Sequence, residues 1–159
     1  MGSTRRPWCH WMARIHEELA FTVIELLVVI AILGVLIGIA MPVFLGAQHV
    51  AEDRKVQADL RTALAASLTF FAEAGIWDAF DAAQGDAAEP SLSWVDGAPP
   101  TGREISIAVH AGQELVLVSR STSGTFFCVA QLLGNPATDR GSGASFAAVD
   151  TVVECTGGW

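Results

Sequence analysis

One acidic side chain interrupts an otherwise apolar stretch near the start of the chain. Glu25 lies within FTVIELLVVIAILGVLIGIAMP, which covers residues 21–42. A carboxylate near the start of an apolar segment that is long enough to cross a membrane is costly to remove from water. Taken alone, Glu25 is best explained by a position at the depth of the lipid headgroups, where water solvates it.

Cysteines are the second set of reactive side chains, and the chain has three: Cys9, Cys128 and Cys155. Cys9 belongs to a short charged leader, residues 1–20. If the leader is removed, the two cysteines that remain form an even pair, which in an exported domain indicates a disulfide. The alternative is two unpaired buried thiols. We expect the Cys128–Cys155 bridge, with a stabilisation of about 3–4 kcal/mol on the chain-entropy model.

The other polar side chains lack the spacing that catalysis or metal binding requires. His49 and His110 stand alone, without ligand spacing or a nearby nucleophile. An acidic cluster in the middle of the chain does not match the calcium-loop pattern, so a solvated loop is expected. Its members are Asp78, Asp81, Asp86 and Glu89. We find no phosphate-binding loop, catalytic triad or zinc motif, and we expect no enzymatic activity, cofactor or metal.

Composition and net charge limit the classes of protein to which the chain can belong. The 159 residues are 52% hydrophobic, and the excess is concentrated at one end, which indicates a membrane segment rather than an oversized core. The formal net charge is −8 with only nine Lys and Arg residues. This balance gives no support to nucleic-acid binding by the chain as a whole.

The apolar stretch is long enough to cross a bilayer. The uncharged span runs from Leu26 through Gln48, which exceeds the 7–15-residue core of a cleavable secretory signal. Its Leu, Ile, Val and Phe residues suggest about −4 to −8 kcal/mol for insertion. Arg5, Arg6 and Arg14 precede it, so we expect the leader on the cytoplasmic side and the rest of the chain outside. The predicted localisation is a single-pass cell-membrane protein.

The helix is predicted to continue beyond the membrane segment. Apolar residues recur every three to four positions along one stripe, at Val56, Leu60, Leu64, Leu68 and Phe71. Pro42 alone more often kinks a helix than ends it. We therefore expect one helix over residues 21–74, ending near Gly75, with a transmembrane half at about 21–47 and an amphipathic half after it.

The remaining residues, 75–159, predict a β-sheet head. Residues 76–101 are expected to form a long loop with a short helix near Trp77–Ala83. Period-2 runs then predict four strands, EISIAVH, ELVLVSR, TFFCVAQLL and FAAVDTVVEC, with a looser loop at Gly134–Ser145 before the last. The predicted fold class is α+β: a long N-terminal helix packed on a small antiparallel sheet.

The stretch at residues 21–42 resembles a known family, the type IV pilins and the pseudopilins of type II secretion. The family pattern is a short charged leader, then Phe, Thr, two aliphatic residues, Glu and an apolar run that reaches a Pro. Phe21, Thr22, Glu25 and Pro42 stand at the matching places. The match covers about 22 residues, and the order of helix, loop and sheet also agrees with a pilin fold. The chain departs from the pattern at Ala20, where the family has Gly.

The resemblance implies a mechanism. A prepilin peptidase would cut between Ala20 and Phe21 and methylate the new Phe21 amine. Subunits would then pass from the membrane, through inner-membrane assembly machinery, into an extracellular pilus with their apolar helices bundled at its centre. Glu25 would pair with the Phe21 ammonium of a neighbouring copy, since an opposite charge offsets the cost of burying a carboxylate. Local loss of helix around Pro42 is also implied, eased by Gly34, Gly38 and Gly46. Such subunits have no enzymatic activity and assemble with themselves.

Two alternatives stay open at this stage. The chain could be a single-span protein whose exported domain binds a partner at the cell surface without polymerising. It could also be a minor pilin or pseudopilin of a secretion or DNA-uptake system. Only Arg103, Arg120 and Arg140 are basic in the predicted head, so strong DNA binding by a lone subunit is not expected.

Overall fold

The computed structural model describes residues 21–110, 112–135 and 137–159. The predicted leader, residues 1–20, lies outside this description, and so do Cys9 and Ala20. The chain divides into two compact units at residues 43 and 44. We call residues 44–159 the head unit and describe each unit by itself.

The longest element is α1, Val23–Ala74, which crosses from the first unit into the head unit. It matches the predicted helix, with Pro42 inside it and Gly75 directly after it at φ +77°. Gly75 tolerates this left-handed backbone because it has no Cβ, and its N–H bonds the carbonyl of Phe71 at 2.7 Å. By length and composition α1 is suited to span a membrane.

The head unit contains a five-stranded sheet in the order β1-β2-β3-β4-β5. The strands are β1 Trp94–Asp96, β2 Ile105–His110, β3 Glu114–Arg120, β4 Phe126–Leu132 and β5 Thr138–Gly143. Strands β2 to β5 form an antiparallel meander, whereas β1 pairs with β2 in parallel. The predicted α+β class is confirmed, with a mixed sheet in place of a purely antiparallel one.

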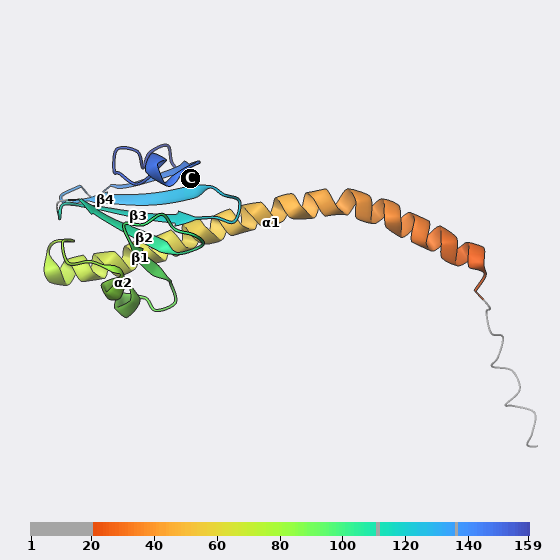
Figure 1. The fold of residues 1–159 in the computed structure, drawn as a ribbon, viewed down its shortest axis with the longest axis horizontal. Helices are drawn as coiled ribbons and strands as arrows, with labels where there is room; N and C mark the ends of the chain where they lie inside the picture. Colours follow the sequence, from red (N-terminus) through yellow and green to blue (C-terminus); the bar gives the residue numbers. More distant parts are fainter. Residues whose placement is uncertain (1–20, 111, 136) are drawn as a thin grey trace, which may run out of the picture. The chain divides into compact units, whose positions relative to one another are not determined.

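One face of the sheet packs against the second half of α1 (Figure 1). The helix contributes Val56, Leu60 and Ala63, all fully buried, together with Ser67. The sheet contributes Ile105, Ile107, Leu115, Leu117, Phe127 and Val129. Because successive strand residues point to opposite faces, these alternating positions form one continuous apolar surface under the helix.

The buried stripe of α1 is shifted from the predicted one. Ala63 and Ser67 are buried, whereas Leu68 is 41% exposed and Leu64 only partly buried. The Ser67 hydroxyl donates to the Leu64 carbonyl at 2.8 Å, which satisfies it inside the core. The helix therefore buries two small residues against the sheet at positions where the apolar stripe predicted larger ones.

The opposite face of the sheet is covered by residues 146–155 of the C-terminal segment (144–159). Val149 and Cys155 are fully buried there against Val116, Val118 and Cys128. Strands β3 and β4 are therefore buried on both faces, which explains their nearly continuous apolar sequences.

The predicted fourth strand, residues 146–155, was wrong. This segment begins with the short 3-10 helix η1, Phe146–Ala148, and continues in turns. The strand beside β4 is instead β5, TDRGSG, inside the predicted loop 134–145. A Cβ on Gly141 would lie 2.6 Å from backbone atoms of Thr156, so the glycine is needed where the C-terminal segment crosses β5.

The region between helix and sheet also carries more structure than expected. Its short helix, α2, spans Ala82–Ala88 rather than lying near 77–83. The Asp81 carboxylate accepts the Gln84 N–H at 2.9 Å, and the Asp96 carboxylate accepts the Ala82 N–H at 2.8 Å. Two acids thus cap one helix start, and one of them comes from β1. These caps set the position of α2 beside β1.

Candidate functional site at the start of the apolar helix

The first turn of α1 is capped by Thr22. Its hydroxyl accepts the Glu25 backbone N–H at 3.3 Å and donates to a Glu25 carboxylate oxygen at 3.3 Å. The bond from the Glu25 N–H to the Thr22 hydroxyl is one half of a capping box, whereas the Glu25 carboxylate accepts the Thr22 hydroxyl in place of the Thr22 backbone N–H. The carboxylate also lies at the positive end of the helix dipole. Thr22 therefore fixes the place of Glu25 on the helix.

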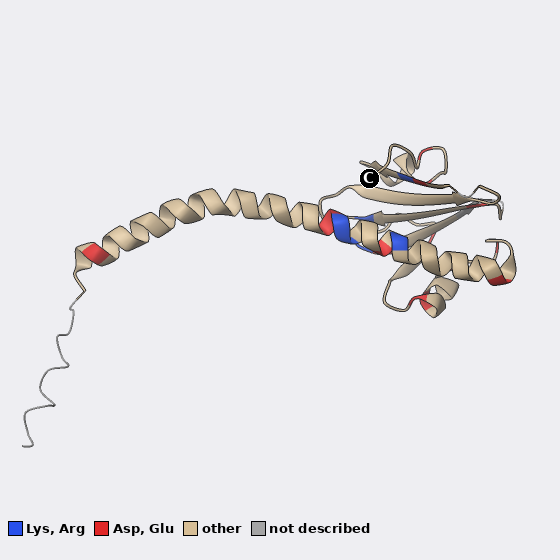
Figure 2. Cartoon of the chain, turned by 180° about the vertical axis from the view of Figure 1, so that it is seen from behind, with Lys and Arg blue, Asp and Glu red and all other residues tan. Residues whose placement is uncertain are grey.

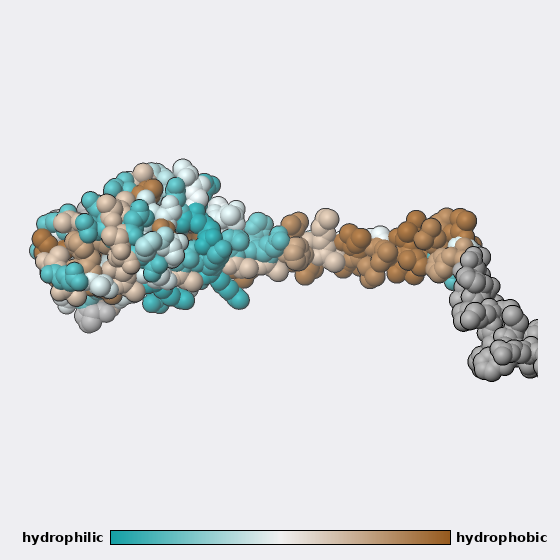
Figure 3. Space-filling view, turned by 90° about the horizontal axis from the view of Figure 1, so that it is seen from below, coloured by the Kyte–Doolittle hydropathy of each residue, from teal (hydrophilic) through white to brown (hydrophobic). Residues whose placement is uncertain are grey.

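Glu25 is the only charged residue in the apolar half of α1, and the next one along the helix is Glu52 (Figure 2). Among the described residues it has no ion-pair partner. The side chains around it are apolar and exposed, as the brown surface of this segment shows (Figure 3). A lone carboxylate in such surroundings needs water or a cation from outside the described chain.

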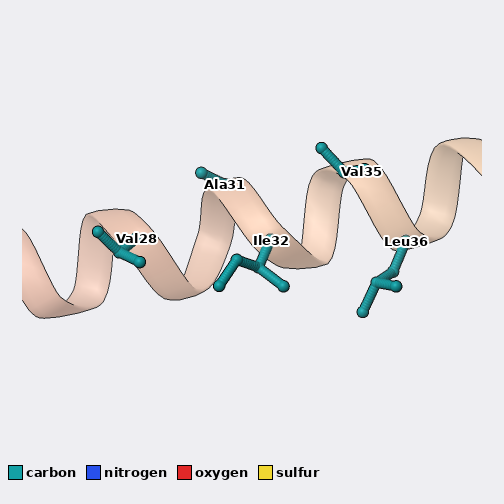
Figure 4. Close-up of a pocket in the computed structure, with 5 residues that line it drawn as sticks. All are labelled: Val28, Ala31, Ile32, Val35 and Leu36. Carbon is teal, nitrogen blue, oxygen red and sulfur yellow. The ribbon is translucent and has the colours of Figure 1, made fainter.

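The apolar half presents a groove of regular form on its surface. Val28, Ala31, Ile32, Val35 and Leu36 line it (Figure 4). The spacing of the first four, i, i+3, i+4 and i+7, is that of the holes that accept side chains in knobs-into-holes packing between helices. All five residues are exposed. The groove is thus suited to an apolar side chain from another helix.

The glycines and the proline in the first part of α1 make no packing contacts that explain their presence in the described chain. Gly34, Gly38 and Gly46 have no heavy atom within 4 Å of the place where a Cβ would stand. No contact within the described chain therefore requires glycine at these positions. Pro42 lies inside the helix, and the helix assignment continues through it, so the expected loss of helix around it is not a feature of this single chain.

The predicted disulfide is present between Cys128 and Cys155, with the two Cα atoms 5.8 Å apart. Cys128 lies on β4 as expected, but Cys155 lies in the C-terminal turns rather than on a strand. Both residues are fully buried. The bridge therefore fastens the C-terminal segment to the sheet.

The remaining polar candidates do not converge on one place. His49 is exposed on α1, and His110 ends β2. Of the acidic cluster, Asp81 caps α2 and Glu89 accepts the Ser91 hydroxyl at 2.7 Å. No group of three or more His, Cys, Asp or Glu residues suited to a metal ion occurs in the part of the chain that the structure describes.

Sequence reasoning missed the capping role of Thr22. The signal was present, because Thr22-Val-Ile-Glu25 has the T-x-x-E spacing of a capping box directly before an apolar helix.

Sequence reasoning also missed the contacts of Trp159. The indole N–H of Trp159 donates to the Cys128 carbonyl at 3.0 Å, and the Arg61 and Arg140 guanidinium groups lie 5.0 and 5.5 Å from its ring. This one side chain links α1, β4 and β5.

Comparison with family models, curated proteins and solved structures gave no match to this chain. The order of one long apolar N-terminal helix followed by a small β-sheet is compatible with a pilin-like fold.

Proposed function

We propose that the chain is a structural subunit of a type IV pilus or pilus-like filament, assembled from the membrane through its apolar N-terminal helix. One observation carries the proposal: Glu25 stands unpaired in the first turn of an exposed apolar helix, four residues after Phe21. A soluble protein would not leave this helix uncovered. In a membrane anchor alone, the acid would have only the local role of capping the helix.

The chemistry of Glu25 supports assembly. In a bundle of apolar helices an unpaired carboxylate costs several kcal/mol, and a cation within a few ångströms offsets much of that cost. Cleavage before Phe21 by a prepilin peptidase creates an amine in the same apolar surroundings. The Phe21 ammonium of one copy and the Glu25 carboxylate of the next then satisfy each other. The groove beside Ala31 gives a neighbouring helix a place to pack.

A second candidate is a single-span surface protein that does not polymerise. The capping contact with Thr22 favours it, because it gives Glu25 a local role that needs no neighbouring subunit. In this case the leader is retained, and the helix serves only to hold the head unit at the membrane.

Intact-mass analysis of the full chain, extracted from membranes of cells that contain a prepilin peptidase, separates the two candidates. The filament proposal predicts a mature chain that begins with N-methylated Phe21. A chain that keeps residues 1–20 contradicts it and supports the anchor. Expression without the peptidase is the control, since the full-length mass should then return.

A further inference from the structure

The second half of α1 has an outer face whose residues are exposed in the described chain. Val56, Leu60 and Ala63 point to the sheet. Half a turn away, exposed alanines recur every seven residues, at Ala51, Ala58, Ala65 and Ala72. Small side chains on a helix face allow another element to approach its backbone closely. Within the head unit this face is open.

Arg54 lies beside these alanines and has no partner of its own. It is exposed, and among the described residues no hydrogen bond, ion pair or ring contact involves it. The positions three and four residues away, where a helix would place a paired acid, hold Val50, Ala51, Gln57 and Ala58. Lys55, also exposed, follows directly. Arg54 and Lys55 therefore place two exposed cations on α1 directly after the half-buried acids Glu52 and Asp53; Figure 2 shows the red and blue stretches side by side.

A different stretch of the head unit is acidic in sequence. Between Arg61 and Arg103 the chain carries no Lys or Arg but six acids, at Glu73, Asp78, Asp81, Asp86, Glu89 and Asp96. Several of them have local roles, since Asp81 and Asp96 cap α2 and Glu89 bonds Ser91. Asp86, on α2, is exposed and makes no such contact among the described residues. It is the acid of α2 that is free to meet a cation.

We propose that the outer face of α1 around Arg54 docks on the α2 surface around Asp86 of a second copy of this chain. The Arg54 and Asp86 side chains carry opposite charges. Both belong to the same chain, so the arginine of one copy can pair with the aspartate of the next. Because the two patches are different, the contact is head-to-tail and adds copies without closing a pair. The inference rests on the proposed function and names the contact between head units that accompanies packing of the apolar helices.

Charge reversal tests the contact in a way that misfolding cannot imitate. Arg54→Glu and Asp86→Arg are each expressed in the full chain, alone and together in the same membranes, and oligomers are counted after chemical cross-linking in mild detergent. Each variant alone should lose at least about tenfold of the cross-linked oligomer, because like charges then face each other. Co-expression should restore it, since the glutamate introduced in one variant meets the arginine introduced in the other, and the native pair forms at the alternate contacts.

Asp139→Arg is the matched control. It makes the same charge change on β5, at the sheet edge opposite to β1, and should leave the oligomers unchanged. Normal oligomers from either single variant, or no recovery on co-expression, overturn the inference. Oligomers that are unchanged while Arg54→Glu loses binding to vesicles of anionic phospholipid would also overturn it and assign Arg54 to lipid.

The inference and the proposed function fail separately. Filaments that form normally from Arg54→Glu subunits contradict only the docking contact. Cross-linked oligomers that obey the charge-swap pattern, in cells that never yield filaments, support the contact and contradict the filament.

Discussion

At the scale of the residue, Glu25 has one observed contact and one proposed role. In the single chain its carboxylate and its N–H interact with Thr22 and start the helix. In a filament the same carboxylate is proposed to pair with an amine of the next copy. A capping contact contributes about 1 kcal/mol, whereas an uncompensated charge in an apolar bundle costs several. The proposed pairing would therefore be the larger of the two contributions.

The two roles are separable by substitution. Glu25→Ala should leave membrane insertion intact and lower the filament yield strongly when no wild-type subunit is present. Thr22→Val removes the capping hydroxyl but keeps the carboxylate, and should lower the yield only slightly. Quantification of sheared filaments against the membrane pool measures both. Equal losses from the two variants would assign Glu25 to capping alone.

At the scale of the element, periodicity predicted α1 and strands β2 to β4 because each shows its own apolar repeat. It failed at β5, whose sequence TDRGSG has no β-branched apolar residue, and which forms because it pairs with β4 and lies under the C-terminal segment. It failed again at residues 146–155, where apolar residues face the sheet from turns. In both places tertiary contact, rather than local propensity, selects the structure.

The site itself was predicted in part. The position of Glu25 in the first turn follows from the sequence, and so does the cysteine pair. The capping contact of Thr22 could have been predicted from the sequence but was missed. The contacts of Trp159 could not have been predicted, because they depend on where three distant elements meet.

The packing of α2 on β1 predicts a strict requirement for Gly85. A Cβ there would lie 2.4 Å from the Trp94 ring, although alanine is otherwise the better helix former. Gly85→Ala should destabilise the head unit by about 1–3 kcal/mol through overpacking. Gly102→Ala, where a Cβ meets nothing within 4 Å, is the control. Thermal unfolding followed by tryptophan fluorescence measures both, and equal stability of the two variants would contradict the packing.

The disulfide holds the C-terminal segment over the back of the sheet. Replacing Cys128 and Cys155 together by Ser should lower the free energy of unfolding by about 3–4 kcal/mol, since the bridge spans 27 residues. Denaturant unfolding of the oxidised wild type against the double variant gives the difference. Reduction of the wild type should lower the free energy of unfolding by a similar amount. If neither change lowers it, the bridge adds no stability.

At the scale of the whole molecule, the first half of α1 is an apolar helix that stays exposed among the described residues, and the head unit has a core of its own. The head unit folds around the second half of α1, so that half is fixed by its own chain, whereas the first half has apolar surface on every side. In the proposed filament, membrane lipid would cover this surface before assembly and identical helices would cover it afterwards. Polymerisation through the first half would then require no refolding of the head unit.

The most direct measurement is the composition of surface filaments sheared from cells that express the chain with a prepilin peptidase and assembly machinery. A filament fraction whose dominant subunit is this chain, beginning at N-methylated Phe21, is the expected result. A processed chain that stays wholly in the membrane fraction while the cells are competent to assemble filaments would contradict the proposed function.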